Sequence, residues 1–160
     1  SVGGNDIALF PTPCTILSMA GLLCCPKMCI KSSCTTCALP MNDCCCGCGP
    51  STISCLGSCP PCFGYFRHLL GIRVQKYIEA LTAKTKPKKI LVCMIYYLDE
   101  NNAPSWANSS LGAMGYNSDP EKLQLIIKAF YEQITSRIQI SGTEVIPVPL
   151  FHVLDGKRSE

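Results

Sequence analysis

The apolar residues of this chain predict two amphipathic helices with an apolar strand between them. From residue 64 onward, apolar residues recur every three or four positions while charged residues fill the opposite face. This spacing is typical of a helix that buries one side. Its apolar positions are Phe66, Leu70, Val74, Tyr77, Ile78 and Leu81. Lysines and a proline at residues 84 to 89 predict the helix end, because cations are favourable there and proline cannot continue the helix.

The segment from Ile90 to Tyr97 is a continuous apolar run, which is typical of a strand covered on both faces in a parallel sheet. After a polar stretch at residues 99 to 118, a second helix is predicted to begin at Asp119-Pro120-Glu121, an N-cap followed by a proline at the first helical position. A further strand is predicted from Glu144 to Val148, and its prolines keep it short. The buried stripe of the second helix is predicted to be Leu123, Ile126, Ile127, Phe130, Ile134 and Ile138.

With residues 1 to 9 as the end of an earlier strand, the predicted order is strand, helix, strand, helix, strand. This order is typical of an α/β fold with a doubly wound parallel sheet. Ligands of such sheets bind beyond the carboxyl ends of the strands. Residues 3 to 6, 99 to 118 and 151 to 156 all fall at these ends, so we expect a functional site there.

The most informative short block is Gly3, Gly4, Asn5 and Asp6. Glycines permit φ > 0 and the close approach of another group, and an asparagine after them can direct its amide at an oxyanion. An ordinary turn is the alternative interpretation of these four residues. The block resembles the Gly-x-Asn-Asp block of the SGNH (GDSL-like) hydrolases. The resemblance extends to the segments at residues 88 to 100 and 142 to 156, and covers residues 1 to 13 and 63 to 160.

This resemblance implies a flavodoxin-like three-layer α/β/α sandwich, here a partial SGNH hydrolase-like domain spanning residues 1 to 160. It implies a serine esterase or lipase-like hydrolase that acts on small carboxylic or acetyl esters and needs no cofactor. Asn5 would donate to the oxyanion, while Gly3, Gly4 and Asp6 would support the turn. Trp106, in the long polar loop, would either line the acyl pocket or pack the loop onto the domain.

The nucleophile and base blocks of the resembled family are not found in this sequence. No serine stands in a Gly-Asp-Ser context, and the residue three positions after Asp155 is Arg158 where that family has histidine. We interpret Asp155 as a loop acid, and His68 and His152 as structural residues. The chain is therefore interpreted as an internal fragment, and we expect it to be catalytically inactive by itself.

The cysteines form a separate block, since all but Cys93 of the 14 lie between Cys14 and Cys62. We predict an irregular insertion over residues 14 to 62, and a buried strand position for Cys93. Three CxxC pairs have the spacing of zinc ligands: Cys34 and Cys37, Cys45 and Cys48, Cys59 and Cys62. Disulfides, S-acylation that tethers the domain to a membrane, and a low-complexity insertion with none of these roles are the alternatives.

Composition limits the remaining possibilities. A chain of 160 residues suits one domain. A net charge of +3, with no Lys/Arg cluster interleaved with aromatic residues, argues against nucleic acid as a partner. Outside the cysteine block the composition is that of a reduced intracellular protein, although the compartment is left undetermined. The competing functional class is a non-catalytic pseudo-hydrolase, or a binding scaffold whose cysteine-rich segment binds zinc or is acylated.

Overall fold

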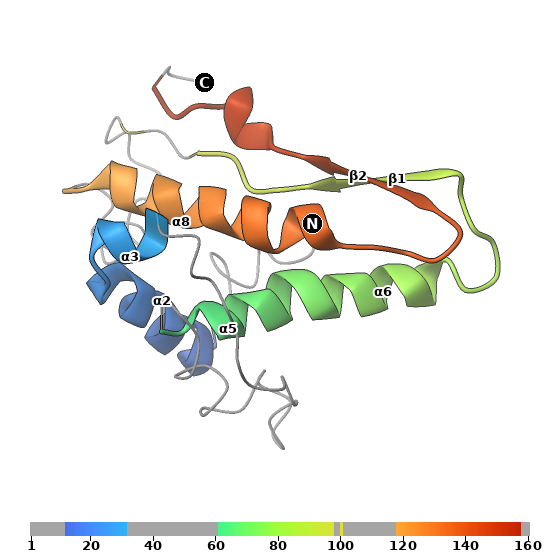
Figure 1. The fold of residues 1–160 in the computed structure, drawn as a ribbon, viewed down its shortest axis with the longest axis horizontal. Coiled ribbons are helices and arrows are strands. Elements are labelled where there is room, and N and C mark those ends of the chain that lie inside the picture. Colours follow the sequence, from blue (N-terminus) through green and yellow to red (C-terminus); the bar gives the residue numbers. More distant parts are fainter. Residues whose placement is uncertain (1–11, 32–60, 98–99, 101–117, 158–160) are drawn as a thin grey trace.

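The computed structural model describes residues 12–31, 61–97, 100 and 118–157. Figure 1 shows a small sheet with helices gathered on one side of it. The described part of the chain contains α2 (Pro13–Cys24), α3 (Lys27–Lys31), α5 (Phe63–Phe66), η1 (Arg67–Ile72), α6 (Arg73–Leu81), β1 (Lys89–Cys93), α8 (Pro120–Gln133), η2 (Thr135–Arg137), β2 (Glu144–Val148) and η3 (Leu150–His152).

The two described strands are parallel, as expected from the sequence. β1 pairs with β2 in a register that runs from Lys89 opposite Glu144 to Cys93 opposite Val148. α8 connects them, and its first helical residue is Pro120, as the sequence predicts. All six apolar positions predicted for the stripe of α8 and the turn after it are buried. The mixed α/β character of the fold is therefore confirmed.

The first predicted helix is also present, with one difference in its geometry. α5, η1 and α6 follow one another without a break, and η1 is a wider π-helical segment between the two α-helical parts. Phe66, Leu70 and Val74 are buried, but Tyr77 and Leu81 are exposed. The apolar stripe is therefore covered only in part: Ile78 still packs under the sheet, whereas Tyr77 and Leu81 remain open to solvent.

α6 and α8 cover the same face of the sheet. Val74 and Ile78 of α6 pack in one cluster with Val92 of β1 and Val145 of β2. Met94, which follows β1, belongs to the main core with Phe130 of α8. Figure 1 shows both helices on the same side of the two strands.

The opposite face of the sheet carries the Lys89–Glu144 ion pair at one end and apolar side chains beyond it, and it is not fully covered. Leu91 is 64% exposed and Cys93 is also exposed, so the prediction of a buried Cys93 in a strand covered on both faces is wrong. Side chains alternate between faces along a strand, so Val92 points to the helices while its two neighbours point away. The described residues thus form helices over one face of a sheet, which is two layers of the expected three.

The prediction of an irregular insertion is wrong for its first part, because α2 and α3 are helices. The Thr12 side chain caps α2 by accepting a hydrogen bond from the Thr15 N–H at 3.2 Å, and Pro13 occupies the first turn. Met19 and Leu22 belong to the main core. The sequence of α2 contains no charged residue, so its buried and exposed faces differ little in polarity and its periodicity is weak.

α3 is joined to the start of α8 by an ion pair. Lys27 Nζ lies 2.8 Å from a carboxylate oxygen of Asp119 and 2.6 Å from one of Glu121. Hydrogen bonds from Lys27 lower the pKa of Asp119 and raise that of Lys27 itself. Both carboxylates stand at the positive end of the α8 dipole, which also favours their charged form.

A buried hydrogen bond joins α2 to α5. The hydroxyl groups of Thr15 and Tyr65 lie 2.6 Å apart, and Thr12 contributes a third hydroxyl 3.0 Å from that of Thr15. Tyr65→Phe should lower the free energy of unfolding by about 1 kcal/mol, because the buried Thr15 hydroxyl keeps only its Thr12 partner. Urea denaturation measures this loss. Tyr77→Phe, on the exposed side of α6, is the matched control; equal stability of the two variants would contradict the prediction.

Candidate functional site

Beyond the carboxyl end of the sheet, the segment that follows β1 and the segment that follows β2 continue side by side. Tyr97 N–H donates to the Leu154 carbonyl at 3.2 Å, and Glu100 N–H donates to the Gly156 carbonyl at 2.9 Å. Gly156 has φ of 73°, a conformation that glycine adopts without steric cost. We call residues 94–97 and 149–156 the sheet rim. The rim is the described part of the region where the sequence places a functional site.

An aromatic cluster fills the inner side of the sheet rim. Phe151 stacks on Tyr97 with ring centroids 5.0 Å apart, and Tyr131 of α8 meets Phe151 edge-on at 5.6 Å. Phe151 is itself buried. These rings pack the sheet rim against α8, so the inner side of the rim is filled by side chains and contains no open pocket.

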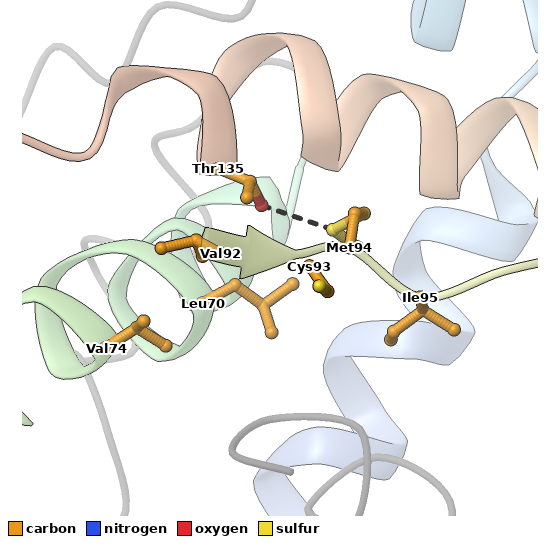
Figure 2. Close-up of a pocket in the computed structure, with 7 residues that line it drawn as sticks. All are labelled: Leu70, Val74, Val92, Cys93, Met94, Ile95 and Thr135. Atoms are coloured by element: carbon orange, nitrogen blue, oxygen red, sulfur yellow. Dashed lines mark hydrogen bonds between the residues drawn. The ribbon is translucent and has the colours of Figure 1, made fainter. Parts of the chain in front are cut away.

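A small cavity lies beneath the carboxyl end of β1. Its volume is about 40 Å³, and Figure 2 shows Met94 and Thr135 pointing toward each other in its wall. Thr135 Oγ1 donates to Met94 Sδ at 3.2 Å. Sites for small molecules usually measure several hundred Å³, so this cavity is a packing defect and not a substrate site. The cavity is lined by Leu70, Val74, Val92, Cys93, Met94, Ile95 and Thr135.

The outer edge of β2 is closed to a further strand. Glu144 N–H donates to the Lys88 carbonyl at 3.0 Å, and Met94 N–H donates to the Val148 carbonyl at 2.9 Å. Backbone groups of a parallel strand alternate between its two sides, so residue 147 faces away from β1. Pro147 has no N–H to donate there, and its carbonyl lies 3.5 Å from the Tyr131 hydroxyl, which donates to it.

The outer edge of β1 differs, because it keeps every donor and acceptor. By the same alternation, Ile90 and Val92 bond to β2, and the backbone groups of Lys89, Leu91 and Cys93 point to the outer edge. None of these three residues is proline. The sheet can therefore grow past β1 but not past β2.

Most of the site residues predicted from the sequence lie outside the described part of the chain. This holds for Gly3, Gly4, Asn5, Asp6 and Trp106, and for the zinc candidates Cys34, Cys37, Cys45, Cys48 and Cys59. The exception is Cys62, which is half-buried at the start of α5. Within the described ranges, no three His, Cys, Asp or Glu side chains are grouped so as to hold a metal ion.

The structure also describes the surroundings of both histidines and of the rim acid Asp155. His68 is only 2% exposed, in the π-helical segment η1. His152 is exposed, with its ring 4.7 Å from that of Phe151. Asp155 accepts a hydrogen bond from the Lys157 N–H at 3.1 Å, which is a local turn contact.

Sequence reasoning missed the unequal edges of the sheet, although Pro147 was a visible indication that β2 lies at an edge.

Comparisons with known proteins add no relative: no family model matches this chain, and no curated protein and no solved structure is significantly similar to it. Within the described residues, none of the helices has the length and apolar character needed to cross a bilayer.

Proposed function

We propose that this chain is part of an SGNH-type serine esterase or lipase-like hydrolase with a flavodoxin-like three-layer sandwich. The proposal is supported mainly by one observation: β1 has an outer edge open to another parallel strand, whereas that of β2 is closed. A further parallel strand can pair at this edge, and we assign it to the amino-terminal part of the sequence, which contains the Gly3 to Asp6 block.

Handedness supports the same placement. Parallel strands joined through a helix make right-handed crossovers. When consecutive connecting helices lie on the same face, each new strand is therefore placed on the same side of the strand before it. Because α6 and α8 cover the same face, the strand that comes before α6 belongs on the side of β1 away from β2. We assign this position to the strand that ends in residues 1 to 9. The exposed apolar face at Leu91 and Cys93 is then the surface for the third layer.

This arrangement brings Asn5 to the sheet rim, beside residues 94–97. The side-chain amide of Asn5 then donates a hydrogen bond to the oxyanion that forms as an ester carbonyl is attacked. Gly3 and Gly4 allow the turn, and Asp6 supports it. Hydrolysis by this mechanism also needs a serine nucleophile and a histidine base, and no Gly-Asp-Ser or Asp-x-x-His block in these 160 residues supplies them.

The test of this function uses the natural protein at its full length and a fluorophosphonate probe, which labels activated serines. We expect labelling of one serine, together with hydrolysis of p-nitrophenyl acetate. Asn5→Ala should lower the hydrolysis rate by about 10²–10³-fold, since one oxyanion donor is lost.

Gln139→Ala is the control, because it removes an exposed carboxamide from another part of the chain. Equal rates for the Asn5 and Gln139 variants would refute the oxyanion role. A full-length protein that neither reacts with the probe nor hydrolyses the ester would instead favour a non-catalytic binding domain. The 160-residue chain by itself should be inactive in the same assay.

A further inference from the structure

The structure brings two cysteines from distant parts of the sequence to the same glycine. Cys25 follows α2, and its Sγ donates to the Gly21 carbonyl at 3.4 Å. Cys62 Sγ lies 2.7 Å from the point where a Cβ on Gly21 would stand. A side chain larger than glycine at position 21 would therefore collide with Cys62. Both cysteines also pack against the main core.

The backbone of Cys62 is held in an uncommon conformation. Its φ of 71° and ψ of −5° lie in the left-handed region, and it is the only non-glycine with positive φ among the described residues. Such a conformation persists in a folded protein only when the surroundings maintain it. Here Cys62 is the N-cap of α5, and its thiol lies against Gly21 of α2.

We propose that Cys25 and Cys62 form a reversible disulfide, which joins the corner between α2 and α3 to the start of α5. This inference is independent of the proposed hydrolase function. The bond would connect the two described ends of the cysteine-rich segment. It would thereby convert that segment into a closed loop anchored on the main core.

A peroxide is the oxidant class that balances the reaction. The Cys25 thiolate attacks one peroxide oxygen, the O–O bond breaks, and a sulfenic acid forms with release of water. The Cys62 thiolate then attacks the sulfenic sulfur, the S–O bond breaks, and a second water leaves as the S–S bond forms. Two thiols and one hydrogen peroxide thus yield one disulfide and two waters.

The electrostatic environment predicts how this reaction depends on pH. Burial raises the pKa of the Cys62 thiol, and the neighbouring Cys25 raises it further. Burial likewise raises the pKa of Cys25, the neighbouring thiols Cys29 and Cys24 raise it further, and Lys122 acts in the opposite direction. Both groups are therefore mostly protonated at neutral pH, and the rate of bond formation should keep increasing above the ordinary thiol range.

The experiment treats the reduced protein with hydrogen peroxide and maps its peptides without reduction. We expect a peptide pair linked through Cys25 and Cys62, lost again on treatment with dithiothreitol. Oxidation should raise the midpoint of thermal unfolding by roughly 5 °C, because the cross-link restricts the unfolded chain. Cys25→Ser and Cys62→Ser should each abolish both the linked pair and this increase.

Cys24→Ser is the matched control, since Cys24 is the exposed neighbour of Cys25 and should leave the linked pair unchanged. Gly21→Ala provides a second test that keeps both thiols, because its new Cβ would displace the Cys62 sulfur and lower the yield of the link several-fold. A dominant link between Cys25 and Cys29, or a yield unaffected by Gly21→Ala, would overturn the proposal. So would peroxide treatment that links neither Cys25 nor Cys62.

Discussion

Replacing Phe130 with alanine is expected to lower the free energy of unfolding by about 3–5 kcal/mol, the usual cost of removing a buried aromatic ring. Phe130 is only 1% exposed. Its ring stacks on that of Phe66 at 4.7 Å and lies 5.5 Å from that of Phe63. The truncation would therefore leave a cavity between α5 and α8, with a loss of ring–ring contact on two sides.

Urea denaturation followed by circular dichroism, under reducing conditions, measures this loss. Phe130→Leu keeps most of the volume and should cost clearly less than the alanine variant. Tyr77→Ala serves as the surface control, because Tyr77 is 49% exposed on α6. If Phe130→Ala costs no more than Tyr77→Ala, the central position of Phe130 in the core is wrong.

Gly71→Ala is expected to destabilise the protein by about 1–3 kcal/mol, the range for inserting an atom into a packed core. The sequence alone predicts the opposite, because alanine stabilises a helix by roughly 1 kcal/mol relative to glycine. The structure reverses the sign, since a Cβ at position 71 would stand 2.9 Å from Cγ2 of Ile134. Ile134 is 3% exposed and has little room to move.

A double-mutant cycle with Ile134→Ala tests this explanation. Ile134→Ala destabilises by itself, but it removes the colliding methyl group, so Gly71→Ala should cost much less in its presence. Ala80→Gly in α6 is the matched control: position 80 is exposed, and glycine there should lower stability by roughly 1 kcal/mol. A stabilising effect of Gly71→Ala in the wild-type background would show that Ile134 yields easily.

The helices and strands between residues 63 and 148 follow from local sequence because their patterns have strong contrast. The alternation of apolar and charged positions in α6 and α8, and the proline after Asp119, act within a few residues. α2 was not predicted, because its sequence lacks this contrast between apolar and charged positions. It has no charged side chain to mark its exposed face, so only its packing against the core distinguishes one face from the other.

Burial on the sheet also required the tertiary structure. A continuous apolar run indicates a strand but does not tell which of its faces another layer covers, and Cys93 proved exposed. The candidate site shows a similar division. The sequence predicts it at the carboxyl ends of the strands, whereas the unequal edges of β1 and β2 were established by their hydrogen-bond register.

The sequence by itself thus determined the order and the type of the elements between residues 63 and 148, because propensity, capping and periodicity are local properties of the chain. The tertiary structure alone decided which faces are covered, which edge of the sheet has no proline, that Ile134 packs against Gly71, and that the Cys62 thiol reaches Gly21. These features depend on contacts between residues far apart in the sequence, and no local pattern encodes such contacts.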